Sequence, residues 1–328
     1  MRTITKTGVM ILMIATSAML GFAAGPPEAE WPNPDRTISV VVPFGAGGGT
    51  DLIFRELVDE MNRHTDATVI VDNIGGAGSA TGTNEVLNLP ADGYTVLASG
   101  AHTITATLQG LTEGTARLEG IIGLNWDPFI VAVPVSKPWQ SFAEVVRAAQ
   151  ADPGSVSFGN AGMGGATGVL TVGMDLYFEN IFNVTPFDGG ANLIATALGG
   201  DVDMGVFSQS EVQQHRGQLR PLMIVHPQRS LIPELADIPT YRELGYTGMR
   251  VPYGSFRSLS VREGTPANVK ERLAGIATAA FESQRFQDYM VRMGLLPEYH
   301  RLEELDAYNA ELEATFSTIL EAAGLLSR

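Results

Sequence analysis

The chain has 328 residues, a length that fits two α/β domains better than one, and its hydrophobic fraction of 45% supplies a sizeable core. Its formal net charge of −15 makes nucleic acid and anionic lipid poor partners. The absence of cysteine excludes disulfides, thiolate nucleophiles, cysteine zinc sites and a lipid anchor on a cysteine.

The N-terminus has the pattern of a secretory signal peptide. Arg2 and Lys6 precede an uncharged apolar stretch from Gly8 to Ala24, and small residues follow up to Gly25. A short positive region, an apolar region and a small-residue cleavage site are typical of export signals. We therefore expect residues 1–25 to be removed and the mature protein to be exported. An uncleaved membrane anchor is the alternative.

The first part of the mature chain alternates strand and helix patterns. The apolar run Val40–Val42 stops at Pro43, glycines follow from Gly45, and apolar residues then recur at helical spacing up to Met61. A strand at 68–71, a helix at 79–89 and a strand at 94–98 complete a βαβαβ unit. Such a unit predicts a parallel sheet with crossover helices.

The second part repeats this alternation and ends in helices. Ser141 and Glu144 form a capping-box pattern at the start of a helix that extends to Gln150. Further strands are expected at 128–133, 156–158, 202–207, 219–225 and 255–261. Further helices are expected from 165 to 179, at 190–198, 267–281, 284–293 and 302–320, and the segment 227–248 is expected on the surface.

Two strand-and-helix sets followed by a helical tail predict two lobes. The chain is expected to cross between them near 126–134 and again near 251–260. We therefore assign 31–130 to lobe 1, 131–252 to lobe 2 and 253–328 to the return into lobe 1. The cleft between two such lobes is the expected ligand site.

Four glycine-led loops precede predicted helices, and they point to anion binding. The loops are Gly45–Thr50, Gly75–Gly82, Gly159–Gly168 and Asp188–Ala191. The first loop lacks the Lys-Ser/Thr of a Walker A motif and the third glycine of the dinucleotide fingerprint. One such loop alone would indicate only a tight strand-to-helix connection. Several helix starts that face one cleft would present backbone amides to a carboxylate.

Catalytic and metal-binding patterns are missing from the sequence. There is no Gly-x-Ser-x-Gly elbow, and the five histidines are scattered without metal-ligand spacing. His102 stands apart because it follows the end of a predicted strand beside Ser99, where ligands gather in parallel sheets. We therefore expect no cofactor, no metal and no enzymatic activity. A secreted α/β enzyme remains an alternative that would need a catalytic set these residues do not assemble.

In this order, the motifs resemble those of the Bug (TctC-type) extracytoplasmic solute receptors of tripartite tricarboxylate transporters. The resemblance covers nearly all of the mature chain. The matching blocks are Trp31-Pro-x-x-x-Arg36-x-Ile38, Val40 to Phe44, Gly47-Gly-Gly-Thr-Asp51, Val71-Asp72-Asn73-x-x-Gly76-Ala77-Gly78, Ala91-Asp92-Gly93-Tyr94-Thr95, Phe187-x-Gly189-Gly190-Ala191, Leu198-Gly199-Gly200-x-Val202-Asp203, Leu219-Arg220-Pro221-Leu222, Ile238-Pro-Thr240-x-x-Glu243-x-Gly245 and Gly264-Thr-Pro266.

The resemblance implies a two-lobed, type II periplasmic binding protein fold with mainly parallel sheets and flanking helices. It implies a monomeric periplasmic receptor that binds a small carboxylate and delivers it to the membrane subunits of a tripartite tricarboxylate transporter. A ligand-sensing partner of a two-component sensor kinase is the alternative. The ligand-binding residues that it implies are Phe44, Gly45, Ala46, Asp51, Gly78, Ser79, Ser99, His102, Gly162 and Thr167. Asp188 and Asp203 are further candidates for the same site.

This chain departs from the family pattern at the fourth loop. The family usually carries Tyr-Lys-Gly-Gly where this sequence has Phe187-Asp188-Gly189-Gly190. If Asp188 lines the cleft, the ligand is expected to carry a cationic or amino group beside its carboxylate, or to be less anionic than citrate. The alternative is a solvated aspartate that is stabilised by the helix dipole. The segments 105–120 and 161–167 also depart from the family pattern.

Overall fold

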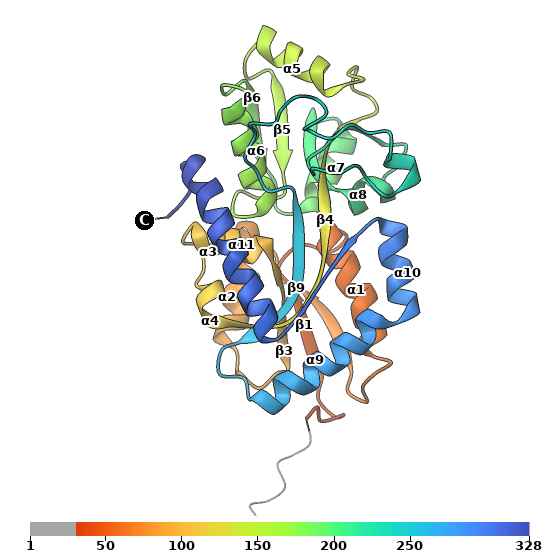
Figure 1. Cartoon of the computed structure of the whole chain (residues 1–328), viewed down its shortest axis with the longest axis vertical. Helices are drawn as coiled ribbons and strands as arrows, with labels where there is room; N and C mark the ends of the chain where they lie inside the picture. Colours follow the sequence, from red (N-terminus) through yellow and green to blue (C-terminus); the bar gives the residue numbers. More distant parts are fainter. Residues whose placement is uncertain (1–30, 328) are drawn as a thin grey trace, which may run out of the picture. The chain divides into compact units, whose positions relative to one another are not determined.

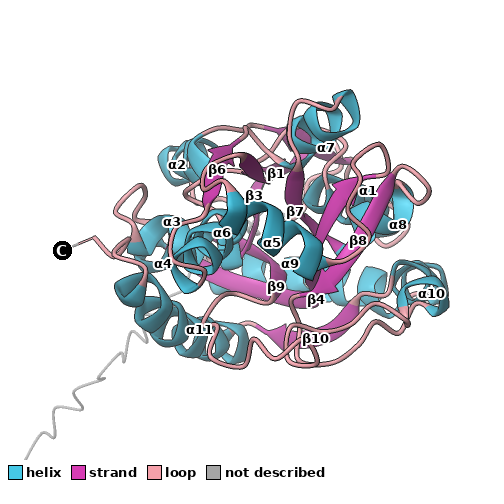
Figure 2. Cartoon of the chain, turned by 90° about the horizontal axis from the view of Figure 1, so that it is seen from above, coloured by secondary structure: helices cyan, strands magenta, loops and turns pink. Residues whose placement is uncertain are grey.

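A ten-stranded mixed sheet runs through the computed structural model, which describes residues 31–327. Its main path has the strand order β2-β1-β3-β9-β4-β7-β5-β6, and β8 and β10 both pair with β4. In Figure 1 the two long strands β4 and β9 run lengthwise between a lower group of elements and an upper group. Figure 2 shows helices on all sides of the strands.

The lower group is built from the first βαβαβ unit. Its strands β1, β2 and β3 are parallel, because each is followed by a crossover helix. Phe54, Leu57 and Met61 of the first helix are fully buried against the strands. The elements are β1 (Ile38–Val42), α1 (Gly49–Met61), β2 (Val69–Asn73), η1 (Ala77–Ser79), α2 (Ala80–Asn88), β3 (Thr95–Gly100), α3 (Ala101–Leu108) and α4 (Gly114–Arg117).

The strand β4 (Leu118–Pro134) belongs to both groups. From Leu118 to Pro128 it pairs antiparallel with β9 (Gly254–Arg262), and from Phe129 onward it pairs with β7 and β8. Every residue from Gly120 to Pro134 is buried, which accounts for the nearly continuous apolar run. Since β4 changes partners at Phe129, one strand connects both halves of the sheet.

The upper group repeats the strand-and-helix alternation. Strands β7, β5 and β6 are parallel to one another, and β7 pairs with β4. Phe158 and Met204 are fully buried in the core of this group. The elements are α5 (Phe142–Ala151), β5 (Val156–Asn160), α6 (Ala166–Tyr177), β6 (Phe182–Pro186), α7 (Gly190–Gly199), β7 (Met204–Ser208), α8 (Gln209–Gln214), β8 (Leu219–Ile224) and η2 (Pro233–Leu235).

The last part of the chain returns to the lower group. Helices α9 (Ala267–Glu282) and α10 (Gln284–Met293) pack against α1, and α11 (Glu303–Ala322) packs against α3 and β4. Strand β10 (Leu296–Arg301) pairs antiparallel with β4. No helix among residues 31–327 is long and apolar enough to cross a membrane.

The fold class expected from the sequence is confirmed, but the structure also has elements that the sequence did not predict, among them strand β6 and helix α8. Segment 296–301 is an edge strand inside a tail that was expected to be helical, and 101–108 is a helix that was not expected. At the start of α5, Ser141 caps the amide of Glu144, but the Glu144 carboxylate bonds the amide of Gln140. The predicted signal peptide lies outside the described residues.

Candidate functional site

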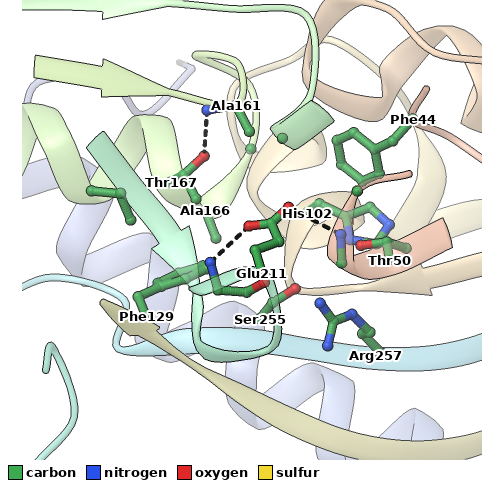
Figure 3. A pocket seen from close by; sticks show the side chains of 16 residues that line it. Phe44, Thr50, His102, Phe129, Ala161, Ala166, Thr167, Glu211, Ser255 and Arg257 are labelled. Carbon is green, nitrogen blue, oxygen red and sulfur yellow. Dashed lines mark hydrogen bonds between the residues drawn. The ribbon is translucent and has the colours of Figure 1, made fainter. Parts of the chain in front are cut away.

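A pocket that is partly open to solvent lies where the lower and upper groups meet. It is lined by the loop before α1, the starts of α3, α6 and α7, and residues of β4, β7, α8 and β9. The lining residues are Phe44, Gly48, Gly49, Thr50, His102, Phe129, Ala161, Gly165, Ala166, Thr167, Gly190, Val206, Ser208, Glu211, Ser255 and Arg257. Figure 3 shows their side chains.

Asp51 shapes the glycine loop before α1. Its carboxylate accepts hydrogen bonds from the Gly47 amide at 2.8 Å, from Arg55 at 2.8 Å and from Asn73 at 2.9 Å. Burial raises the pKa of Asp51, but these hydrogen bonds outweigh burial and hold it below its usual value. Gly47 has a φ of +90°, which glycine adopts without strain. Asp51 therefore holds the loop and is not among the lining residues.

A carboxylate from the upper group lies at the start of α1. Glu211 accepts a hydrogen bond from the Gly49 amide at 3.0 Å through Oε1 and from the Ser208 amide at 2.8 Å through Oε2. The second bond belongs to a capping box at α8. Dashed lines in Figure 3 mark hydrogen bonds of the Glu211 side chain. The positive end of the α1 dipole therefore already holds one carboxylate of the chain itself.

The close approach at α1 requires a glycine. A Cβ added at Gly49 would lie 2.6 Å from Ser208 Oγ and 2.9 Å from Arg257 Nη2. A side chain at this position would separate α1 from β7 and β9. The glycine-rich character of this loop therefore follows from contacts with residues more than 150 positions away.

A buried ion pair forms the floor of the pocket. Arg257 Nη1 lies 2.9 Å from Asp127 Oδ2, and the exposed fraction of both side chains is 2% or less. Asp127 also accepts hydrogen bonds from the amide and the hydroxyl of Ser210. Arg257 Nε has no hydrogen-bond partner among the described residues. The pair therefore links β4, β9 and α8 directly beneath the pocket.

His102 contributes a neutral imidazole. Its Nε2 lies 3.0 Å from the Ala98 carbonyl oxygen, which only accepts hydrogen bonds, so Nε2 carries the proton. Burial lowers the pKa of His102 to about 4, and the charge of Arg257 adds to this effect although the Ala98 carbonyl opposes it. Nδ1 is left as an acceptor, buried and without a partner among residues 31–327. The ring contacts Phe44 edge-on, with centroids 5.0 Å apart.

Glycine loops from the two groups touch each other beside the pocket. A Cβ added at Gly78 would lie 2.5 Å from Gly164 Cα, so a side chain at Gly78 would push the two backbones apart. The Thr105 hydroxyl donates to the Gly164 carbonyl at 2.9 Å, and Gln109 Nε2 donates to the Met163 carbonyl at 3.3 Å. These contacts join the loop before α6 to η1 and α3.

The sequence-predicted residues fall into three sets. Phe44, His102 and Thr167 line the pocket, and the Thr167 hydroxyl accepts a hydrogen bond from the Ala161 amide. Five more lie near the pocket: Gly45, Ala46, Gly78, Ser79 and Gly162. A Cβ on Gly162 would lie 3.1 Å from Gly78 Cα, and the Ser79 hydroxyl donates a hydrogen bond to the His102 carbonyl. The other four, Asp51, Ser99, Asp188 and Asp203, are not among the lining residues.

These four residues have other surroundings. Ser99 bonds to Ser258 and Ser260 and lines a separate cavity. Asp188 is exposed just before α7. Asp203 forms an ion pair with Lys137 at 2.7 Å and accepts two hydrogen bonds from Ser157.

Sequence reasoning missed Glu211, Arg257 and Asp127. The run Ser208-Gln-Ser-Glu211 has the capping-box pattern, directly after a predicted strand. Arg257 is the one charged residue inside the predicted strand 255–261, and a charge in a buried strand indicates a paired or functional group. These signals identify candidates but not the distance between them. No group of three or more metal-ligating side chains occurs within residues 31–327.

Comparison with known proteins gives consistent matches. The model of the "Tripartite tricarboxylate transporter family receptor" (TctC) family matches residues 53–325. Protein BugT of Bordetella pertussis is 30% identical over 245 residues, which cover 73% of each chain. The structure of the periplasmic binding protein BugD superposes with a TM-score of 0.83 at 26% identity, over 90% of this chain and all of BugD. MatC of Rhodopseudomonas palustris with bound malate superposes with a TM-score of 0.79 at 21% identity, over 88% of this chain and all of MatC.

Proposed function

The chain belongs to the TctC family of tripartite tricarboxylate transporter receptors, and from that premise we propose that it binds one small carboxylate in the pocket between the two groups. We further propose that it delivers this ligand to the membrane subunits of a tripartite transporter. The observation that carries the proposal is the geometry at the start of α1. There the Glu211 carboxylate accepts a hydrogen bond from the Gly49 amide at the edge of the pocket.

Further hydrogen-bond donors around the cavity support a carboxylate ligand. Thr50 follows Gly49 at the helix start, and the Thr167 hydroxyl hydrogen is free to donate because its oxygen accepts from Ala161. The Arg257 guanidinium lines the floor. Backbone amides at helix starts, hydroxyls and a buried guanidinium together suit an anion in a site screened from water.

The strand pairing and the glycine contacts support a two-lobed receptor that closes on its ligand. We propose lobes of residues 31–130 with 253–328, and of residues 131–252, because β4 changes partners at Phe129 and β9 begins at Gly254. The hydrogen bonds from Thr105 and Gln109 to the loop before α6 would then form on closure. Two-lobed proteins of this kind place the ligand between rigid halves.

We propose that residues 1–25 are a cleaved export signal and that the mature receptor works in the periplasm, as the family membership supports. A thermal-shift screen of mature protein tests the binding step. Malate, adipate, citrate, amino acids, sugars and metal cations are added one at a time, and at least one carboxylate should raise the midpoint temperature by an amount that grows with the logarithm of its concentration. No shift with any carboxylate, but a shift with sugars or cations, would contradict the proposal.

A genetic experiment tests the delivery step. Deletion of this gene and deletion of genes for tripartite-transporter membrane subunits should abolish uptake of the same labelled carboxylate. Normal uptake combined with a lost transcriptional response would instead indicate the sensing role.

A further inference from the structure

We propose that Glu211 sets the ligand class of the pocket, so that the receptor selects a carboxylate with an ammonium group over the matching dicarboxylate. This inference rests on the proposed function, because it concerns the same pocket. Glu211 is 7% exposed, and it comes from α8 of the upper group although its carboxylate contacts the start of α1. The ligand must therefore share the space between the lobes with a fixed carboxylate.

The Glu211 carboxylate has no cationic partner within residues 31–327. Its hydrogen bonds from the Gly49 and Ser208 amides use one acceptor position on each carboxylate oxygen. A carboxylate has about four acceptor positions, so both oxygens retain capacity for a donor on the ligand. The nearby Arg257 forms its ion pair with Asp127, and within residues 31–327 no ion pair or hydrogen bond joins it to Glu211.

The charges around the pocket leave it with a negative balance. Arg257 is positive, Asp127 and Glu211 are negative, and His102 is neutral at pH 7 because burial depresses its pKa to about 4. A dicarboxylate would add two further negative charges to this confined space. An aminocarboxylate adds none, and its ammonium group would offset Glu211. Uncompensated buried charge is strongly unfavourable, so the second ligand fits the balance better.

His102 provides a second hydrogen-bond acceptor, Nδ1, that has no donor among the described residues. Its Nδ1 is unprotonated, buried and without a partner among the described residues, and the ring lines the same pocket. A ligand with only carboxylate groups has no proton for this nitrogen. An ammonium group has three N–H donors, so it can serve acceptors of both kinds.

The donors for the other end of the ligand come from different residues. Thr50, Thr167 and Arg257 line the pocket and supply hydroxyl and guanidinium hydrogens for a carboxylate. Acceptors and donors are thus both present in one cavity, which is the pattern that a zwitterion requires. Asp188 is exposed and is not among the lining residues, so the negative charge that selects the ligand is that of Glu211.

The test compares acids with amines of matched length by titration calorimetry on the mature protein at pH 7.5. The three pairs are succinate with 3-aminopropanoate, glutarate with 4-aminobutanoate, and adipate with 5-aminopentanoate. In at least one pair the amine should bind about tenfold or more tightly than the acid. Glu211→Gln keeps the shape of the side chain but removes its charge. It should reduce the ratio of the amine's affinity to the acid's affinity about tenfold or more.

Glu144→Gln is the matched control, because Glu144 occupies the third position of α5 as Glu211 does in α8, far from the pocket lining. It should leave the ratio unchanged. If no pair shows the amine binding more tightly than its dicarboxylate, or if Glu211→Gln does not change the ratio of affinities, this inference is overturned and the proposed function still stands. A natively bound ligand without an amino group has the same consequence. If no carboxylate binds at all, the proposed function and this inference fall together.

Discussion

The imidazole of His102 illustrates how burial sets the chemistry of a single residue. Burial lowers its pKa to about 4, whereas the unfolded chain has the ordinary value of about 6.5. Between these values the unfolded state takes up a proton that the folded state does not. The stability that this residue contributes is therefore complete above pH 6.5 and decreases as the pH falls toward 4.

We expect the free energy of unfolding to fall by about 2 kcal/mol between pH 8 and pH 5 through His102 alone. The measurement is urea unfolding of the wild type and of His102→Gln at both pH values. The amide of glutamine does not titrate, so the variant should lack this part of the pH dependence. An identical pH dependence in the two proteins would show that the imidazole becomes protonated in the folded state.

The residues of the pocket show which features of the site could be predicted from the sequence. The glycine loop was predicted because the strand, the glycines and the helix start that define it follow one another directly in the chain, from Val40 to Asp51. The contact between Glu211 and the Gly49 amide spans 162 positions and depends on how α8 is placed against α1. Spacing along the chain carries no information about such a contact.

At the scale of elements, β4 and β9 are joined by the pair of Asp127 and Arg257. Both side chains are buried, and Ser210 at the start of α8 also bonds to Asp127. Arg257→Met should lower the free energy of unfolding by about 3 to 5 kcal/mol, because it leaves Asp127 buried without its counter-charge. Chemical denaturation of the two proteins measures this difference.

Adding Asp127→Asn to this variant provides the internal control. The asparagine carries no charge, so the double variant should recover part of the lost stability. A loss below about 1 kcal/mol for Arg257→Met alone would mean that water reaches Asp127 and that the pair does not join the strands.

The elements missed from the sequence have weak local signals. Strand β10 contains Pro297 and charged residues, and it is an edge strand that pairs only with β4 among the described residues. Helix α3 is rich in threonine and contains Ile104, and β-branched residues lower helix propensity. In both segments, packing against neighbouring elements determines the structure. The periodic helices and the parallel strands other than β6 were predicted because their patterns follow from burial on one or both faces.

At the scale of the whole receptor, the proposed closure would bring the glycine loops of the two lobes into contact. A Cβ added at Gly164 would lie 2.7 Å from Leu111 Cδ1 and 2.9 Å from the Ala77 carbonyl oxygen. Gly164→Ala should therefore hold the lobes slightly apart and weaken ligand binding about tenfold or more. Scattering curves with a saturating carboxylate should show a larger radius of gyration for this variant than for the wild type.

Gly275→Ala is the matched control for this substitution. Gly275 lies inside α9, and an added Cβ there meets no atom within 4 Å. Alanine in a helix interior should stabilise the protein by about 0.5 to 1 kcal/mol and leave binding unchanged. Equal affinity in Gly164→Ala and the wild type would argue that the glycine contact plays no part in closure.

Mass spectrometry of the ligand released from natively purified mature protein tests the central claim most directly. The account predicts one small carboxylic acid per chain, lost or strongly reduced in Gly164→Ala and retained in Gly275→Ala. A bound compound without a carboxylate, or a carboxylic acid retained equally by both variants, would contradict a carboxylate receptor that closes around the start of α1.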